Sequence, residues 1–269
     1  MEISVVIIAK NEGRMIDDCL KSVKWVDEIL VVDTGSVDET IDIAKKYKAR
    51  VVKYTAGKNF SDWRNRGLKE AKGKWVLYVD ADERIPDDLK KEILSVIPDR
   101  DPESIPIDSR LRGNDIVAYA IPRRNFMFGR EVKHIAVPPD YVKRLFKKST
   151  LKEWSGKLHE EPQFSGELGH LQNPMIHEKH ETFSEMVEKT NKWSEIEAKL
   201  MFEAGHPPMN IPRFLTAILR EFWTRMVVHK AFLDGKIGII YAMYQVFSRF
   251  TSYAKLWELQ NKQSLAKQY

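Results

Sequence analysis

Residues 74–86, KWVLYVDADERIP, place a short apolar run directly in front of a cluster of acids. The run from Trp75 to Val79 is continuous, which predicts a strand buried on both faces of a sheet. Asp80, Asp82 and Glu83 follow at once. Three unpaired carboxylates at the end of a buried strand would be unfavourable. We therefore expect a positive charge to face them.

The segments around this stretch alternate between strand and helix patterns. Continuous apolar runs predict strands at 3–9, 29–32, 50–54 and 74–79, and helical spacing predicts helices at 12–26 and 61–71. Ser36 and Glu39 have capping-box spacing and predict the start of another helix. Strands of this kind, separated by helices, are typical of a parallel sheet covered on both faces. The fold class is α/β, with a mixed, mostly parallel sheet.

Two further segments divide the chain. Residues 98–115, PDRDPESIPIDSRLRGND, are rich in proline and aspartate and predict a surface loop inserted into the domain. Strand patterns at 116–129 and 141–148 complete the sheet, so we assign residues 1–181 to one catalytic domain. Helical patterns at 182–204, 211–233 and 236–259 predict a helical extension over residues 182–269.

Charge is distributed unevenly along the 269 residues. The chain carries a formal net charge of +5, and residues 206–269 hold nine lysines and arginines against three acids. Apolar and aromatic residues alternate with these basic ones, which is typical of a helical hairpin lying at an anionic membrane surface. Packing of the hairpin against the sheet or a second copy is the alternative. We expect no nucleic-acid binding, because no recognised module accompanies the basic residues.

The remaining composition narrows the class of protein. Cys19 is the only cysteine, which excludes an internal disulfide and a cysteine-built zinc site, and its helical context predicts a packed core thiol. No segment has the pattern of a signal peptide, and the longest apolar stretch of the tail, 237–247, is too short to span a bilayer. We expect a reducing, cytoplasmic setting.

Ligands of an open parallel sheet bind outside the carboxyl ends of its strands. Three such ends are polar here, at 9–14, 33–39 and 80–84, yet neither a Rossmann glycine loop nor a P-loop occurs. Something else must neutralise the phosphates of a nucleotide. A divalent cation, Mg²⁺ or Mn²⁺, held by Asp80 and Asp82 would do so, since hard cations take oxygen ligands.

Four segments together resemble the family 2 glycosyltransferases of the GT-A fold. They are SVVIIAKNE, ILVVDTGSVDET, the Arg64–Gly67 segment and WVLYVDADE. The later segments KLHEEP and PMIHEKH are similar to the subgroup of lipopolysaccharide core β-1,4-glucosyltransferases. The resemblance implies a nucleotide-diphosphate sugar such as UDP-glucose as donor and inversion at the anomeric carbon. It also implies a glycan or glycolipid acceptor and work at the cytoplasmic face of a bacterial inner membrane.

The resemblance also implies roles for individual residues. Family members often have two acids after the second strand, and Thr34 replaces the second one here, so which acid reads the base stays open. Asp80 would face the ribose or the metal, and Asp82 would ligate the metal. The donor-binding residues implied in this way are Ala9, Asn11, Glu12, Asp33, Asn65, Arg66 and Asp80.

Inverting transfer needs a carboxylate that takes the acceptor proton from the face opposite the leaving group. Glu160 and Glu161 in KLHEEP are the candidates, with Glu160 preferred. His159 beside them is a candidate metal ligand, a hydrogen-bond donor to the diphosphate, or a residue that holds the loop.

Structural interpretations compete with these roles. Asp80 and Asp82 fit as caps of the helix that begins near Pro86, Asp33 fits as a turn residue, and Glu160 with Glu161 fits as an acidic surface turn. Asn65 and Arg66 fit a solvated helix face. HEKHE at 177–181 has histidines three apart rather than four, so a packing histidine is favoured over zinc.

Two other functions remain open. An Asp-x-Asp after an apolar strand also occurs in haloacid-dehalogenase phosphatases, where the first aspartate is the nucleophile, although there it usually ends the first strand. A non-catalytic nucleotide-sugar binder or membrane scaffold on the same fold is the third possibility.

Overall fold

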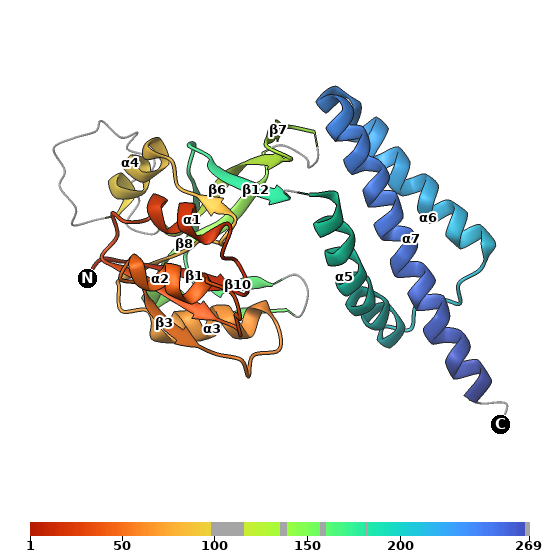
Figure 1. Cartoon of the computed structure of the whole chain (residues 1–269), viewed down its shortest axis with the longest axis horizontal. Coiled ribbons are helices and arrows are strands. Elements are labelled where there is room, and N and C mark those ends of the chain that lie inside the picture. Colours follow the sequence, from red (N-terminus) through yellow and green to blue (C-terminus); the bar gives the residue numbers. More distant parts are fainter. Residues whose placement is uncertain (98–115, 135–138, 157–159, 181, 267–269) are drawn as a thin grey trace. The chain divides into compact units, whose positions relative to one another are not determined.

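The computed structural model describes residues 1–97, 116–134, 139–156, 160–180 and 182–266 (Figure 1). The predicted insertion at 98–115 and His159 lie outside these residues. The chain divides into two compact units, the first formed by residues 1–124 and 139–177 and the second by residues 125–138 and 178–269. Each unit has its own core and is described separately.

Four parallel strands form one half of the sheet in the first unit. They lie in the order β3–β2–β1–β4, with Ser4 paired to Glu28 and to Val76 across the two central neighbours. Every residue of β1 is buried, as expected for a strand covered on both faces. The strands are β1 (Ile3–Ala9), β2 (Glu28–Asp33), β3 (Arg50–Lys53) and β4 (Trp75–Tyr78).

The other half of the sheet is mixed. Beyond β4 the order continues β8–β6–β12–β5, where β8 runs antiparallel to β4 and to β6, and β11 pairs parallel with β6. A separate antiparallel hairpin is formed by β9 (Leu151–Ser155) and β10 (Glu161–Phe164). The further strands are β5 (Glu83–Arg84), β6 (Ile116–Met127), β8 (Tyr141–Lys147), β11 (Glu167–His170) and β12 (Met175–His180). The predicted α/β class with a mixed, mostly parallel sheet is confirmed.

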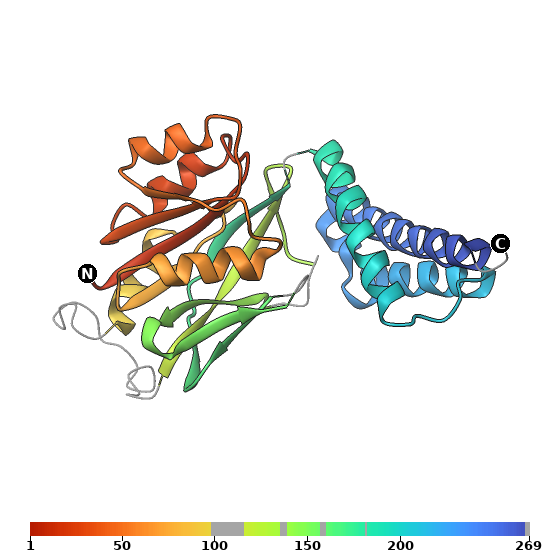
Figure 2. The same cartoon turned by 90° about the horizontal axis from the view of Figure 1, so that it is seen from below.

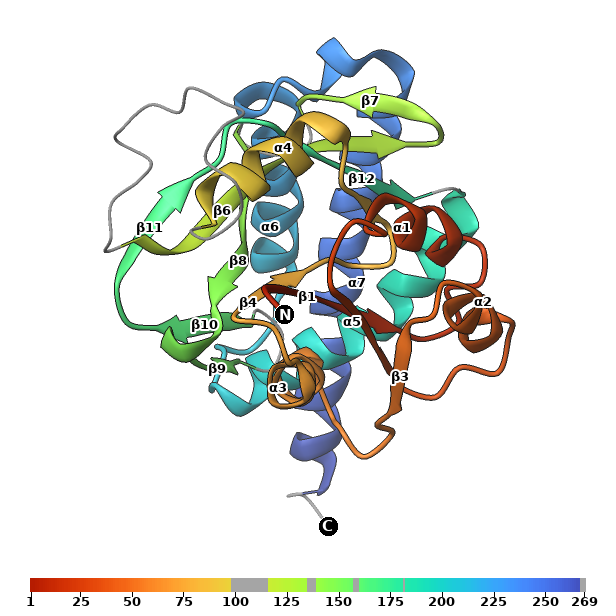
Figure 3. The same ribbon diagram turned by 90° about the vertical axis from the view of Figure 1, so that its left-hand side faces the viewer.

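Helices cover both faces of this sheet (Figure 3). One face buries Ile3, Val5 and Ile7 under α1 (Ile16–Ser22), α2 (Thr40–Lys46) and α4 (Asp87–Val96). The opposite face buries Val6 and Ile8 under α3 (Phe60–Glu70) and the β9–β10 hairpin. The alternation of β1 side chains between the two cores follows from the period of two in a strand.

The start of α2 differs from the prediction. Glu39 occupies the N-cap position, and no side chain caps the helix there. The Ser36 hydroxyl instead accepts a hydrogen bond from the backbone N–H of Asn11 at 3.0 Å, so it ties the loops after β1 and β2 together. The predicted capping box of Ser36 and Glu39 is wrong, because the Ser36 hydroxyl bonds to the loop after β1 and not to the start of α2.

The second unit contains three long helices and a β-hairpin. The helices α5 (Phe183–Glu203), α6 (Ile211–Trp223) and α7 (Gly235–Ala266) lie side by side, with α7 contacting both others (Figure 2). The end of β6 pairs with β7 (Arg130–Val132), and Met127 and Val132 pack with Met186, Tyr241 and Tyr244. The predicted helical segments are therefore present, although 211–233 is broken after Trp223 by a π-helical turn (Thr224–Val228) and a 3₁₀ turn (Ala231–Asp234).

Among the described helices, none is both long enough and apolar enough to cross a bilayer.

The packing of α3 on β1 depends on one glycine. A Cβ atom added to Gly67 would lie 2.3 Å from Cγ1 of Val6. Gly67→Ala should therefore lower the free energy of unfolding by about 1–3 kcal/mol, despite the better helix propensity of alanine. Urea denaturation followed by circular dichroism measures this difference.

Lys69→Ala on the exposed side of α3 is the matched control. It should change the free energy of unfolding by less than about 0.5 kcal/mol. A Gly67→Ala protein as stable as the wild type would contradict the close approach of α3 to β1.

Candidate active site

The candidate site lies where β1, β2 and β4 end, at the edge of the sheet where their loops meet. Asp80 and Asp82 follow β4 directly, and Glu83 opens the short strand β5. Neither aspartate caps α4, whose N-cap is Pro86 without a side-chain hydrogen bond. The capping interpretation of the acids is therefore not supported, and other partners must balance their charge.

Two arginines, Arg64 and Arg144, supply the positive charge next to Asp80. Arg64 from α3 contacts the carboxylate through Nη2, at 3.1 Å from Oδ1 and 3.4 Å from Oδ2. Arg144 from β8 donates to Oδ2 of Asp80 from the neighbouring strand. Both arginine side chains are almost fully buried. The acids of the opening stretch thus face guanidinium groups that come from two other elements.

Glu83 is the third acid and is fully buried. Arg144 donates to its Oε1 at 2.6 Å, and Nη1 of Arg123 on β6 lies 3.8 Å from the same oxygen. Glu83 also closes the turn after β4, because Oε2 accepts from the N–H of Asp80 at 2.9 Å while its own N–H donates to the Asp80 carbonyl at 2.9 Å. Glu83 therefore fixes the backbone that presents both aspartates.

These charges act on the proton affinity of Asp80. Burial alone would raise its pKa, but the charges of Arg144 and then Arg64 outweigh it and hold the pKa of Asp80 well below the usual range. Burial lowers the pKa of Arg144, whereas the carboxylates of Asp80 and Glu83 reverse this and raise it above the usual range. Asp80 and Arg144 therefore form an ion pair of charged groups at neutral pH.

Arg64 connects this set to the predicted base. Its Nε lies 3.2 Å from Oε1 of Glu160, while its Nη2 holds Asp80. The guanidinium also lies over the ring of Trp154 at 4.7 Å and that of Tyr78 at 5.5 Å from the centroids, which fixes its position. Nη1 of Arg64 is buried without a hydrogen-bond partner among the described residues.

Glu161 occupies a different environment from Glu160. It begins β10, its side chain is 63% exposed, and it pairs with Lys143 at 2.7 Å. Glu160 is 19% exposed and belongs to the arginine network. The structure thus brings Glu160, and not Glu161, together with Asp80.

Asp82 has a different neighbour from Asp80. Its Oδ2 lies 3.6 Å from Nε2 of His177 on β12, where His177 pairs with Glu83 across the two strands. Residues 177–180 of HEKHE consequently belong to strand β12 and not to a helix. His177 thus takes its place opposite Asp82 through strand pairing, and not through helical spacing.

The donor atoms near Asp82 suit a divalent cation only in part. Within the described ranges, no group of three or more histidine, cysteine, aspartate or glutamate side chains is arranged to hold a metal. Asp82 and His177 offer one oxygen and one nitrogen, and both are only partly exposed. A Mg²⁺ or Mn²⁺ site of this kind fits if phosphate and water oxygens complete it, as is common where the substrate carries a diphosphate.

The loops after β1 and β2 are locked to each other by their side chains. Asn11 has φ of 58° and accepts from the N–H of Val37 at 2.9 Å, and the N–H of Glu12 donates to Thr40 at 2.8 Å. The Ala9 carbonyl accepts from the N–H of Thr34 at 3.0 Å. These loops form one rigid rim at the carboxyl end of the parallel strands.

Asp33 is buried and caps its own turn. Its Oδ1 accepts from the N–H of Ser36 at 3.0 Å and its Oδ2 from that of Gly35 at 3.3 Å. This is the turn-residue interpretation of Asp33. Its contact with a nucleotide stays a prediction.

The two α3 residues predicted to bind the donor already have protein partners. Asn65 donates to the carbonyl of Trp154 at 2.9 Å and accepts from its N–H at 2.7 Å, so its amide attaches α3 to β9. Arg66 pairs with Glu70 at 2.8 Å and lies over the ring of Tyr54. Contacts of Asn65 and Arg66 with a donor also stay predictions.

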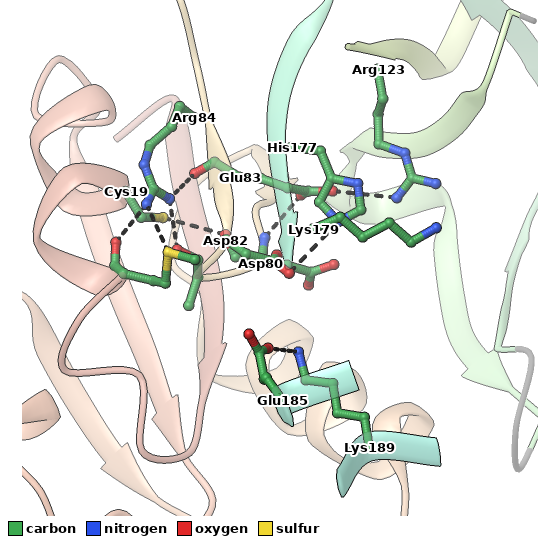
Figure 4. A network of polar contacts seen from close by, with 12 residues as sticks. Cys19, Asp80, Asp82, Glu83, Arg84, Arg123, His177, Lys179, Glu185 and Lys189 are labelled. Carbon is green, nitrogen blue, oxygen red and sulfur yellow. Dashed lines mark hydrogen bonds and ion pairs between the residues drawn. The ribbon is translucent and has the colours of Figure 1, made fainter. Parts of the chain in front are cut away.

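Cys19 is a fully buried thiol behind the acidic turn. Burial raises its pKa above the usual range, and its Sγ lies 3.5 Å from the Asp80 carbonyl oxygen (Figure 4). The predicted core thiol is confirmed. Arg84 stabilises the same turn through the carbonyls of Ala81 at 2.7 Å and Met15 at 2.8 Å.

Sequence reasoning missed the residues that neutralise the acids, although two of them left a signal. Ser61, Arg64 and Leu68 share the buried side of α3 at intervals of three and four, so an arginine sits where an apolar residue is expected. Arg144 shares a strand face with the core residue Phe146. A basic residue on a core-facing position indicates a buried acid nearby. The roles of Glu83 and His177 had no comparable local signal.

The fold and the site together define an α/β protein with an acidic site, paired to buried arginines, at the carboxyl ends of its parallel strands. The family model for glycosyl transferase family 2 matches residues 4–165. The chain belongs to glycosyl transferase family 2. The predicted family and the predicted enzyme class, a glycosyltransferase, are both confirmed.

Relatives of known sequence extend over nearly the whole chain. An uncharacterized glycosyltransferase of Rickettsia bellii is 28% identical over 96% of this chain and 87% of its own length. The lipopolysaccharide core biosynthesis glycosyltransferase LpsC of Rhizobium meliloti is 25% identical over 96% of this chain and 93% of its own. Among solved structures, S. aureus TarS is 16% identical in sequence to this chain. Its crystal structure matches with a TM-score of 0.45 and covers 93% of this chain and 49% of the TarS chain.

The phosphatase alternative does not fit the geometry of the site. Its mechanism requires the first aspartate of Asp-x-Asp as nucleophile. Here both carboxylate oxygens of Asp80 are engaged by Arg64, and one of them also by Arg144. A carboxylate held by two arginines is a poor nucleophile, because its lone pairs already accept charge-assisted hydrogen bonds.

Arg144 neutralises two acids, so its loss should be costly. Arg144→Met leaves Asp80 and Glu83 side by side without their shared guanidinium, and we expect the free energy of unfolding to fall by about 3–5 kcal/mol at neutral pH. Urea denaturation in the presence of a chelator measures the change without any contribution from metal.

Lys143→Met, one residue earlier on β8, is the control, because it removes a charge whose partner Glu161 is mostly exposed. We expect a change of less than about 1 kcal/mol. Equal effects of the two substitutions would mean that the buried arginine contributes no more than a surface one.

Proposed function

We propose that this family 2 glycosyltransferase moves a hexose from a nucleotide-diphosphate sugar, such as UDP-glucose, to a hydroxyl group of a glycan or glycolipid, with inversion. The observation that carries the proposal is the bridge from Asp80 through Arg64 to Glu160. It joins the acidic edge where donors of open sheets bind to the carboxylate predicted to activate the acceptor.

Donor binding would use the rim formed by the loops after β1 and β2. Asn11, Glu12 and Asp33 lie on this rim, and their mutual hydrogen bonds favour a preformed pocket for base and ribose. Asp80 would border it from β4. The full set proposed for the donor is Ala9, Asn11, Glu12, Asp33, Asn65, Arg66 and Asp80.

Asp82 and His177 would hold a divalent cation together with oxygens of the diphosphate, and the cation would supply positive charge to the departing nucleotide. Asp80 is better suited to hold Arg64 and Arg144 near the phosphates than to serve as a ligand itself, since its oxygens already accept from both. His159 is a further candidate ligand from the predicted set.

Glu160 would act as the base. Its carboxylate takes the proton of the acceptor hydroxyl as that oxygen bonds to the anomeric carbon and the bond to the diphosphate breaks. Arg64 orients Glu160 through Nε and keeps it in place beside the donor edge. Glu161, exposed and paired with Lys143, would stand at the acceptor entrance instead.

The acceptor side of the proposal rests on the helical unit and on the relatives. LpsC is named for lipopolysaccharide core biosynthesis, and residues 206–269 carry a surplus of basic charge beside many exposed apolar residues. An amphiphilic acceptor at the cytoplasmic face of an anionic inner membrane fits both. Packing of these helices on a partner protein is the competing use of the same surface.

Asp82→Asn tests the metal site. The substitution removes the charged ligand while keeping the shape of the side chain, so turnover of UDP-glucose with Mn²⁺ should fall about 100-fold or more. The thermal unfolding midpoint in chelator should stay within a few degrees of wild type. Metal-dependent hydrolysis of the donor, followed by release of nucleoside diphosphate, is the measurement.

Asp88→Asn on the exposed side of α4 removes the same charge from a surface pair and should leave turnover unchanged. An active Asp82→Asn enzyme would show that the cation is held elsewhere.

Glu160→Gln tests the base. It should retain donor binding, measured by isothermal titration with nucleoside diphosphate, and lose transfer by about 100-fold or more. Glu161→Gln is the matched control from the adjacent position and should retain most of its transfer activity. The reverse pattern would move the base by one residue.

A further inference from the structure

A cavity of about 390 Å³ opens in the helical unit, and none of its lining residues has been assigned a role above. It is lined by His206, Pro207, Met209, Arg213, Thr216, Ala217, Arg220 and Tyr253. This volume lies within the range of pockets that hold small ligands. None of the lining residues is acidic, whereas two are arginines. The cavity is therefore suited to an anion.

The two arginines of the cavity differ from Arg225 and Arg249 of the same unit. Arg225 pairs with Glu221 at 2.8 Å, and Arg249 pairs with Glu197 at 2.7 Å. Within the described part of the chain, neither Arg213 nor Arg220 has a carboxylate within ion-pair distance, and the Arg213 guanidinium donates to the Pro208 carbonyl through Nη1 at 2.6 Å. Most of their N–H groups thus remain available to a ligand.

The rim of the cavity is held in place by hydrogen bonds between helix α7 and the segment before α6. Gln260 on α7 accepts from the N–H of Met209 at 2.9 Å and donates to the His206 carbonyl at 3.0 Å. The rings of His206 and Tyr253 lie 5.6 Å apart. These contacts fix residues 206–209, so this side of the cavity has a defined position.

Helix α6, which carries Arg213 and Arg220, also has an exposed apolar stripe. Ile211, Leu215 and Leu219 follow each other at intervals of four residues and are between 54% and 75% exposed, and Trp223 continues them at 61%. Arg213, Thr216 and Arg220 share another side of α6, at intervals of three and four. An exposed helix with one apolar and one basic side is typical of a helix that lies in a membrane interface.

We propose that this cavity binds the phosphate of an anionic lipid headgroup when the α6 stripe lies on the bilayer. Arginine is well suited to such a site, because its planar fork donates two parallel hydrogen bonds to phosphate oxygens. The proposal rests on the membrane contact in the proposed function and adds the pocket that makes it specific. It is independent of the transferase chemistry.

Vesicle binding by the full chain tests the pocket. Sedimentation with vesicles of phosphatidylcholine containing about a third phosphatidylglycerol is measured without donor sugar. Charge-assisted hydrogen bonds to phosphate contribute about 1.5 kcal/mol or more for each arginine, so Arg213→Gln with Arg220→Gln should lower the partition coefficient more than about 100-fold. Lys236→Gln with Lys262→Gln removes the same charge outside the cavity and loses only general attraction, at most about 1 kcal/mol for each lysine, so it should lower the partition coefficient by no more than about 30-fold.

Equal losses of vesicle binding in the two double variants would overturn the proposed pocket, because general electrostatic attraction would then explain the role of Arg213 and Arg220. Should the first double variant unfold, Arg213→Lys with Arg220→Lys keeps the charge and loses the planar fork. It should bind about fivefold more weakly than wild type, and wild-type binding would overturn the proposal. Thermal unfolding midpoints verify that all variants are folded.

Two further measurements separate other occupants. Isothermal titration with glycerol 3-phosphate should give no binding at millimolar concentration, and tight binding that depends on both arginines would reassign the cavity to a soluble phosphate. Leu215→Gln should weaken vesicle binding and leave the chain's mass in solution unchanged. A dimer that dissociates in Leu215→Gln would assign the stripe to a second copy.

Vesicle binding and transfer fail independently in these experiments. Loss of donor turnover in Asp82→Asn with normal vesicle binding bears on the metal site alone. Wild-type vesicle binding by the arginine double variant bears on the lipid pocket alone.

Discussion

The clustering of carboxylates beside one another after β4, with Glu83 fully buried among them, is the constraint on which the first unit depends. Asp80, Glu83 and Glu160 are held together only because Arg64 and Arg144 lie between them. Isolated, such charges would cost several kcal/mol each to remove from water. The arginines come from α3 and β8, so the site exists only when the helix and the antiparallel half of the sheet have both packed correctly.

This dependence explains why the sequence predicted the scaffold better than the site. Parallel strands leave a local record in continuous apolar runs, and β1, β2, β3 and β4 were all predicted within about two residues. The partners of Asp80 lie 16 and 64 residues away, and nothing in the acidic stretch itself identifies them. Only an arginine on a buried helix face, as at position 64, hints at the pairing.

Long-range contacts also decide positions at which a local pattern suggests something else. Ser36 has the spacing of a capping residue, but a loop 25 residues earlier uses its hydroxyl. The histidine spacing of HEKHE did not favour zinc, and the pairing of Ile176 and His177 with Arg84 and Glu83 forms a strand that brings His177 opposite Asp82. In both cases a long-range contact overrides a local pattern. Asn65 follows the same rule, since its amide serves the backbone of Trp154.

Arg64 couples Asp80 to Glu160, so substitutions at these two positions should affect each other. One guanidinium touches Asp80 at the proposed donor side and Glu160 at the proposed acceptor side, and it lies over two aromatic rings. A group fixed in this way costs no reorganisation when charge develops nearby, which is the source of electrostatic catalysis. It also makes the two carboxylates energetically dependent on each other. Substitutions at Asp80 and Glu160 therefore should not be additive, because the loss of either one frees the arginine that holds the other.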